Sequence, residues 1–182
     1  MTLTLTQWSV EDYHAMIAAG ILQDRRVELL AGDIVEMTPE SPLHYSSAKQ
    51  GTRHLESLLG DRAEVRFNGP ITLANSEPEP DIAIVHPPAT RYTSRHPGPA
   101  DVFWVVEVSQ SSRQKDLSLK QQIYAQAGIP EYWLVDLVAR QLWVFRDLQN
   151  NIYNTTLKLQ QGPLSPLAFP DVVVEVERFL VI

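Results

Sequence analysis

Two carboxylates in this sequence occupy positions where an acidic side chain is unusual. Asp81 follows Pro80 and opens the apolar segment "DIAIV", and Glu107 lies near the end of "VFWVVEV", a pattern typical of a strand buried on both faces. A carboxylate buried there is costly unless a cation pairs with it. If the two segments form neighbouring strands, both carboxylates converge at one edge of a sheet. Such a pair of oxygen ligands suits Mg²⁺, which can activate water and stabilise charge on a phosphodiester.

A lysine on the next predicted helix is the candidate partner for Glu107. The helix runs from about Arg113 to Ala127 and ends at Gly128 and Pro130. Asp116, Lys120 and Tyr124 follow i, i+4, i+8 spacing and therefore share one helical face. Lys120 could neutralise Glu107, and its ammonium could also hold the attacking water or the scissile phosphate.

The remaining elements must position these side chains. A capping box at Ser9 and Asp12 predicts a helix over Val10–Ala19, and Ser41-Pro42 starts an amphipathic helix that ends at Gly60. The other predicted elements are a hairpin in "RVELLAGDIVEM", the extended segments "EVRF", "PITL" and "DIAIV", a hairpin of "YWLVDL" with "QLWVFRD", the strand "NIYNTTLKL" and a C-terminal hairpin. The segment "HPPATRYTSRHPGP" is predicted to be an exposed, mobile loop. This order predicts an α/β (α+β) fold in which helices flank a mixed central sheet of about five strands.

Length and composition fit one globular domain over residues 1–182. No stretch approaches the ~20 apolar residues of a membrane span, and the N-terminus lacks the features of a signal peptide. The absence of cysteine fits a reducing compartment, so we expect a cytoplasmic protein. The net charge of −7 counts against passive nucleic-acid binding, but less against a nuclease whose clustered carboxylates are offset by a metal ion.

Several of these segments together resemble a known family. "RRVELLAGDIVEM" followed by "SPLHYSSAKQ", then "EPEPDIAIV" and "VVEVSQSSRQKDLSLKQQIYAQAGIPEYWLVDL", resemble the Uma-type putative restriction endonucleases of the PD-(D/E)XK nuclease superfamily. The resemblance extends from about Tyr13 to Leu180. It implies a restriction-endonuclease-like core and Mg²⁺-dependent cleavage of DNA, with Mn²⁺ as a substitute ion.

The superfamily pattern is Pro-Asp, then an acidic residue, one spacer and a lysine. Pro80-Asp81 and Glu107 match it, but the lysine position holds Ser109. In this family the lysine has moved to the following helix in a D-x-x-x-K run, which Asp116 to Lys120 fits. The resemblance therefore implies Asp81, Glu107 and Lys120 as the catalytic residues. It also implies a metal held by Asp81, Glu107, the carbonyl of Val108 and Glu28 of the N-terminal hairpin.

Each of the three catalytic candidates also has a purely structural interpretation. Glu107 could form an ion pair with Lys120 or Arg113 that fixes a helix on the sheet. Asp81 could be an ordinary strand-start residue after proline, and Lys120 a solvated helix lysine.

The neighbouring polar residues also have both a functional and a structural interpretation. Asp116 fits first-turn helix chemistry and is kept as a supporting residue only. Glu28 is equally compatible with a strand-surface carboxylate and with a ligand. His44 could contact a substrate phosphate, although a helix-surface or packing role is favoured. The two histidines and two arginines of the His86–His96 loop could contact nucleic acid, although a solvated loop is the default.

Two further classes of function compete with the endonuclease. A catalytically lapsed relative would keep the fold as a binding or assembly module, which the acidic charge favours and the intact Asp81, Glu107 and Lys120 oppose. The other competing hypothesis is a metal-dependent hydrolase that acts on another phosphoester. DNA is the predicted partner, and exposed hairpins offer surfaces for a homodimer whose two sites would cut two strands.

Overall fold

The computed structural model of the chain describes residues 5–110 and 112–180, without the side chain of Arg113. The main helices are α1 (Val10–Ala18), α2 (Pro42–Leu59), α3 (Arg113–Lys115) and α4 (Gln121–Gln126), with a π-helical segment, η4 (Asp116–Lys120), between α3 and α4. The strands are β1 (Val27–Leu30), β2 (Asp33–Glu36), β3 (Glu64–Phe67), β4 (Ile82–Val85), β5 (Val102–Ser109), β6 (Tyr132–Asp136), β7 (Gln141–Gln149), β8 (Ile152–Leu159), β9 (Pro163–Leu164) and β10 (Val174–Glu175). Short 3₁₀ turns are η1 (Gly60–Arg62), η2 (Ala89–Tyr92), η3 (Pro99–Asp101) and η5 (Val176–Arg178).

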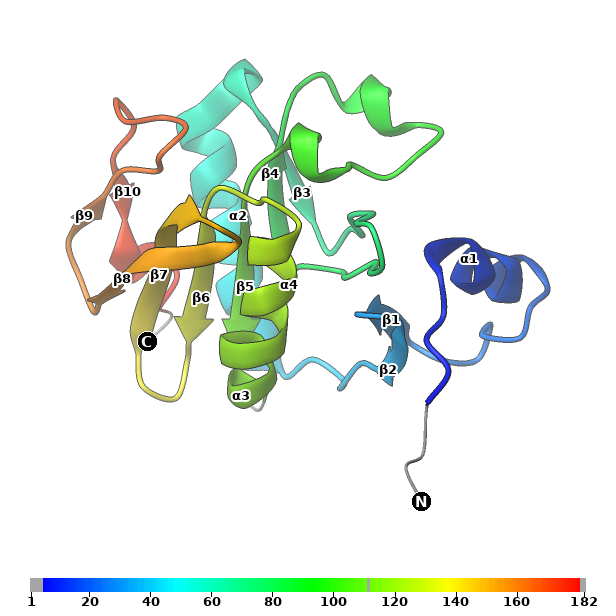
Figure 1. Cartoon of the computed structure of the whole chain (residues 1–182). Helices are drawn as coiled ribbons and strands as arrows, with labels where there is room; N and C mark the ends of the chain where they lie inside the picture. The colour runs from blue at the N-terminus through cyan, green and yellow to red at the C-terminus, as the bar shows by residue number, and fades with distance from the viewer. Residues whose placement is uncertain (1–4, 111, 181–182) are drawn as a thin grey trace.

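A six-stranded mixed sheet in the order β3-β4-β5-β6-β7-β8 forms the centre of the molecule (Figure 1). Only β5 and β6 pair in parallel, and the helical connection between them is the crossover that a parallel pair requires. The other neighbouring strands in this sheet are antiparallel. The predicted mixed α/β architecture is confirmed, with six strands in place of about five.

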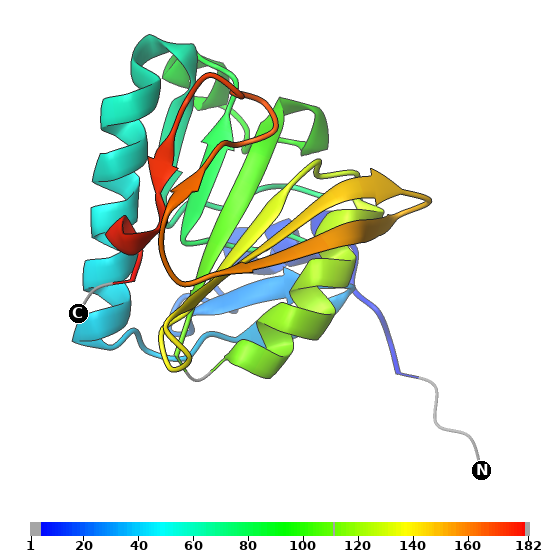
Figure 2. The ribbon, with the colours of Figure 1, turned by 90° about the vertical axis from the view of Figure 1, so that its left-hand side faces the viewer.

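Helices cover both faces of this sheet (Figure 2). Both faces carry apolar side chains that need cover, and strand β5 illustrates this because its alternate residues face opposite sides of the sheet. Trp104 and Val106 belong to a core cluster with α2 and the β9–β10 hairpin, whereas Val105 packs with Ile123 of α4. Glu107 shares its parity with Val105 and therefore lies on the α4 face.

Helix α2 approaches the C-terminal segment closely enough to require a glycine. A Cβ atom added to Gly51 would lie 2.6 Å from the ring of Phe179. The start of α2 is fixed by Ser41, whose hydroxyl accepts the backbone N–H of His44 at 3.1 Å. The helix therefore holds His44 at a defined place beside the sheet edge.

The N-terminal helix and hairpin also follow the sequence prediction. The capping box of α1 is present, and the β1–β2 hairpin turns through Ala31 and Gly32, both with positive φ. That pair of left-handed residues matches the twist of a two-residue hairpin loop. An isolated bridge between Leu29 and Glu77 attaches the hairpin to the segment that leads into β4.

The segment "PITL", predicted to be extended, forms no strand of the sheet. Ile71 and Leu73 are buried, but their backbone N–H groups bond to Pro78 and Ser76 within the same segment. The chain there folds back on itself instead of joining the sheet. In the described part of the chain, no helix combines the length and apolar character needed to cross a bilayer.

Candidate active site

Asp81 and Glu107 meet at one end of the β4–β5 pair. Ile82 pairs with Val106 in the antiparallel register, so the next step opposes Asp81 and Glu107. Residues opposite one another in a sheet present their side chains on the same face. Both carboxylates are almost buried, with 8% and 4% of their residue surface exposed. The predicted convergence of these two residues is confirmed.

Glu107 is held in its apolar strand by donors from the neighbouring helix. Its Oε1 accepts the ammonium of Lys120 at 2.9 Å and the hydroxyl of Tyr124 at 2.5 Å. Lys120 is itself buried, so the interpretation of a solvated helix lysine is wrong. The alternative pairing of Glu107 with Arg113 falls on a side chain outside the described part.

Glu28 joins the same cluster from β1. Its Oε2 lies 3.0 Å from the Nζ of Lys120, and its Oε1 lies 2.9 Å from the Nζ of Lys115. With about 1% of its side chain exposed, Glu28 is not a strand-surface carboxylate. The bridge between β1 and the segment before β4 thus carries Glu28 to the edge where Asp81 and Glu107 lie.

The crossover helix contains the π-helical turn η4, which ends at Lys120. Such turns are rare and occur frequently at functional sites. Lys120 and Tyr124 both reach Glu107, so the predicted common face holds for these two residues. Asp116 instead accepts the hydroxyl of Ser112 at 2.5 Å.

Carboxylates outnumber ammonium groups in this cluster. The pKa values of the individual carboxylates are shifted in different directions, depending on burial and on the nearest lysine. Burial raises the pKa of Glu107 to about 8, against the opposing effect of Lys120, and burial also raises the pKa of Asp116. Although burial acts to raise it, the pKa of Glu28 is held below its usual value by Lys120 and Lys115. Burial acts to lower the pKa of Lys120, but Glu107, Glu28 and Asp116 outweigh it and raise that pKa. The lysine is therefore charged and pairs with the carboxylates of Glu107 and Glu28.

His44 is a site residue that sequence reasoning did not assign. Its Nε2 lies 2.8 Å from Oδ1 of Asp81, while Oδ2 of Asp81 accepts the backbone N–H of Val108 at 2.6 Å. Burial acts to lower the pKa of His44, but the bond to Asp81 outweighs it and raises that pKa. The signal in the sequence was the placement of a histidine in the first turn of a capped helix, which fixes its direction. The ring of His44 is therefore in contact with Asp81, with 18% of its side chain exposed, and its role in the site stays a prediction.

Val108, whose carbonyl the family resemblance implies as a ligand, lines the pocket beside Asp81. A strand residue directs its N–H and C=O to the same side, and the N–H of Val108 points to Asp81. One further step in the β4–β5 register opposes Val108 to Pro80, which has no N–H to donate. The carbonyl oxygen therefore faces the Asp81 side without a backbone donor from Pro80.

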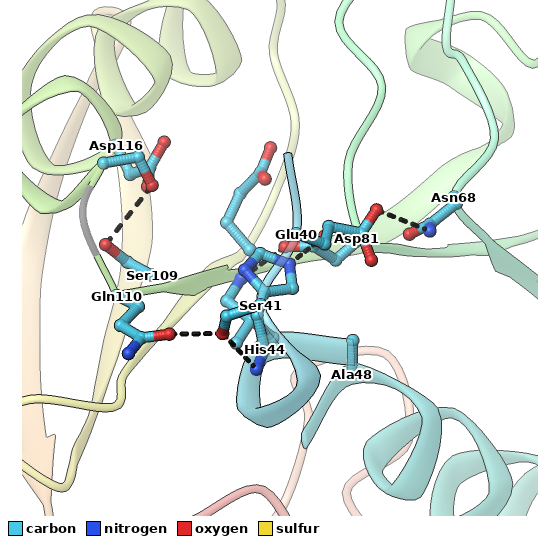
Figure 3. A network of polar contacts seen from close by, with 12 residues as sticks. Glu40, Ser41, His44, Ala48, Asn68, Asp81, Ser109, Gln110 and Asp116 are labelled. Atoms are coloured by element: carbon cyan, nitrogen blue, oxygen red, sulfur yellow. Dashed lines mark hydrogen bonds and ion pairs between the residues drawn. The ribbon is translucent and has the colours of Figure 1, made fainter. Parts of the chain in front are cut away.

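These side chains line a polar pocket of about 100 Å³. It contains all the sequence-predicted site residues, together with His44, Asp116 and Lys115. Figure 3 shows polar contacts around it: Ser41 donates to Gln110 beside His44 and Asp81, and Asn68 donates to Glu40. The His86–His96 loop does not contribute to the pocket lining.

The donor set fits a magnesium-type ion. Among residues 5–110 and 112–180, no group of three or more His, Cys, Asp or Glu side chains is arranged to hold a metal. Mg²⁺ needs fewer protein ligands than that, since it takes one or two carboxylates and keeps several waters. Asp81, Glu107 and the Val108 carbonyl supply hard oxygen atoms of this kind.

The fold and the pocket together define a protein of the nuclease-fold class. A crystal structure described as a putative nuclease belonging to DUF820 from Anabaena variabilis superposes with a TM-score of 0.70 at 14% identity, covering 85% of this chain and 89% of that one. The family model described as "Putative restriction endonuclease", Uma2, matches residues 10–177. The chain therefore belongs to the Uma2 family, and the resemblance seen in its sequence is confirmed. Among curated proteins, no sequence matches this chain.

Proposed function

We propose that the protein is a divalent-metal-dependent endonuclease that hydrolyses phosphodiester bonds in DNA. The observation that carries the proposal is the meeting of Asp81, Glu107 and Lys120 in one buried polar pocket. These are the three residues that the nuclease resemblance implies as catalytic. Membership of a restriction-endonuclease family supports a nucleic-acid substrate.

Asp81, Glu107 and the Val108 carbonyl would hold the ion, with Glu28 as an additional carboxylate. A bound Mg²⁺ or Mn²⁺ supplies Lewis-acid stabilisation of the phosphate and lowers the pKa of a bound water. Lys120 would orient the attacking water, because its ammonium lies 2.9 Å from Glu107 and is held charged by the surrounding carboxylates. Attack of that water on phosphorus breaks one P–O bond and leaves one phosphate end and one hydroxyl end.

His44 would position Asp81 in this arrangement. It occupies one oxygen of Asp81 while the Val108 N–H occupies the other, so the carboxylate has a fixed orientation. Partners of ligating carboxylates tune metal affinity in this way.

The test is cleavage of supercoiled plasmid and single-stranded DNA with Mg²⁺ or Mn²⁺ by the native protein and by Glu107→Ala. Glu56→Ala, an exposed acidic position on α2, is the matched control. We expect ion-dependent cutting that is lost in Glu107→Ala and retained in Glu56→Ala. Equal cutting by all three proteins would reject the proposed site.

A second candidate function is a non-catalytic binding or assembly module. The observation that favours it is the double ion pair of Lys120, which already satisfies Glu107 and Glu28 without a metal. Such a module would bind no Mn²⁺ in an Asp81-dependent manner, whereas the endonuclease would.

A further inference from the structure

The segment after β4, predicted to be an exposed loop, is exposed at only half of its fourteen residues from 86 to 99 and contains ordered turns. It contains the 3₁₀ turns η2 and η3, and Tyr92 at the end of η2 is buried. The hydroxyl of Tyr92 donates to the carbonyl of His86 at 2.7 Å. Tyr92 packs in the same core cluster as Ala83 and Val85 of β4. The aromatic ring therefore fixes this segment to the α4 face of the sheet.

Three guanidinium groups surround that ring. Arg66, Arg91 and Arg95 lie 5.6, 6.0 and 5.5 Å from its centroid. We call Arg66, Arg91, Tyr92 and Arg95 the Tyr92 basic cluster. Cations over an aromatic face are favourable contacts, and they hold the guanidinium groups in place.

The cluster carries an excess of positive charge. Arg91 and Arg95 share one carboxylate, Asp101, at 3.1 and 2.6 Å. Their side chains are 43% and 49% exposed, so donors beyond those used by Asp101 face the solvent. Three guanidinium groups lie around the Tyr92 ring and two of them share a single carboxylate, so the cluster is a local positive region in a chain whose net charge is −7.

A surface hollow lies beside the cluster and is lined by hydrogen-bonding groups. Its lining includes Arg95, His96, His14, Thr72, Thr93 and Ser94. Glu77 is the acidic group beneath it, and its carboxylate is taken up by His14 at 2.8 Å and by Thr72 at 2.7 Å. The hollow therefore offers cationic and hydroxyl donors, a composition suited to a phosphate group.

The cluster and the candidate active site lie on one face of the sheet. Asp81, Ala83 and Val85 share a strand face, and Arg66 pairs with Ala83 across β3 and β4. From Asp81 to His86 the chain advances five residues, or about 17 Å at ~3.4 Å per residue. That length corresponds to about five base pairs of duplex at ~3.4 Å each.

We propose that the Tyr92 basic cluster binds the sugar-phosphate backbone of the DNA substrate, about five base pairs from the bond that is cut. This proposal rests on the proposed endonuclease function and adds its substrate-docking surface. The arginines would grip phosphates and fix the register of the duplex without reading its sequence.

The test is DNA binding without divalent ions, so that nothing is cut. A fluorescent duplex is titrated with native protein and with Arg91→Gln/Arg95→Gln, by anisotropy, at several KCl concentrations. We expect binding about tenfold weaker or more, and a plot of log K against log salt that is shallower by about 1.8, since each phosphate contact contributes about 0.9. Arg62→Gln is the control, because its exposed ion pair with Asp171 lies outside the cluster.

Asp101→Asn tests the same idea in the opposite direction. Asparagine keeps an oxygen that can accept the Gly98 N–H but removes the charge that offsets the arginines. We expect tighter DNA binding and a steeper salt dependence, which a purely structural role of the arginines would not produce.

Two failures can be told apart. A native salt slope in Arg91→Gln/Arg95→Gln, together with ion-dependent cutting by the native protein, overturns the docking surface alone. Absence of both DNA binding and ion-dependent cutting in the native protein overturns the proposed function and this surface with it.

Discussion

Replacing Lys120 with methionine should destabilise the protein strongly. Methionine keeps the length of the side chain but removes the ammonium that lies 2.9 Å from Glu107 and 3.0 Å from Glu28. Breaking a buried ion pair by removing one partner costs about 3–5 kcal/mol, because it leaves buried charge without compensation. The two charge-assisted hydrogen bonds of Lys120, at about 1.5–3 kcal/mol each, give a sum of about 3–6 kcal/mol, which overlaps with that estimate. We therefore expect Lys120→Met to lose about 3–5 kcal/mol of unfolding free energy.

Urea unfolding at pH 7 with a chelator present measures this loss. Lys115→Met is the matched control, since Lys115 also pairs with Glu28 but has a side chain that is 29% exposed. We expect the control to lose about 1 kcal/mol or less. Adding Glu107→Gln to Lys120→Met should recover part of the loss, because one buried carboxylate is removed with its partner. Equal and small losses in both single variants would refute the account of Lys120 as the cation that keeps Glu107 in its strand.

Three further predictions concern other parts of the structure. His44→Ala should weaken Mn²⁺ binding about 10–100-fold in calorimetry, whereas His44→Gln, which can still donate to Asp81, should retain most of the affinity. The ring of His54 accepts the N–H of Glu175, and burial lowers the pKa of this histidine below its value in the unfolded chain. As the pH falls, His54 is therefore protonated in the unfolded chain before it is protonated in the folded protein, which favours unfolding. Urea midpoints of the native protein should therefore fall as the pH drops below about 7, and His54→Gln should flatten that decline. A His54→Gln profile identical to that of the native protein would argue against this role of His54. Glu131 is fully buried with three donors, so Glu131→Ala should lose about 3–5 kcal/mol in the same unfolding assay.

Local patterns in the sequence indicated the Asp81–Glu107 pair and Lys120 as its partner, whereas Glu28 and the Val108 carbonyl came from the family resemblance. The continuous apolar runs beside Asp81 and Glu107 indicate strands buried on both faces, and a short antiparallel pair brings the two carboxylates together. Helical spacing placed Lys120 and Tyr124 on one face, and both contact Glu107 although Lys120 is the last residue of a π-helical turn. Periodicity of this kind depends only on neighbouring residues, so one sequence reveals it.

Other features depend on contacts between distant segments. His44 meets Asp81 because the packing of α2 on the sheet brings its first turn beside β4, and the local cap signal alone does not identify that partner. "PITL" has the composition of a strand, but its hydrogen bonds are satisfied within its own segment. The gathering of Arg66 with Arg91 and Arg95 around Tyr92 likewise depends on tertiary packing.

The catalytic and metal-binding roles, the one-domain organisation, the homodimer and the cytoplasmic location stay predictions. The catalytic and metal-binding roles depend on an ion and a substrate. The homodimer depends on a second copy of the chain, and the cytoplasmic location depends on the cell.

Mn²⁺ binding by the native protein beside Asp81→Asn tests the central claim most directly. Asparagine at position 81 keeps the shape of the side chain and an oxygen for the Val108 N–H, but removes the charge that would hold the ion. Calorimetry at pH 7 should find one Mn²⁺ site per native chain and its loss, or a weakening of about 100-fold, in the variant. Equal binding by both proteins, or no site in the native protein, would contradict a metal centre built on Asp81 and Glu107.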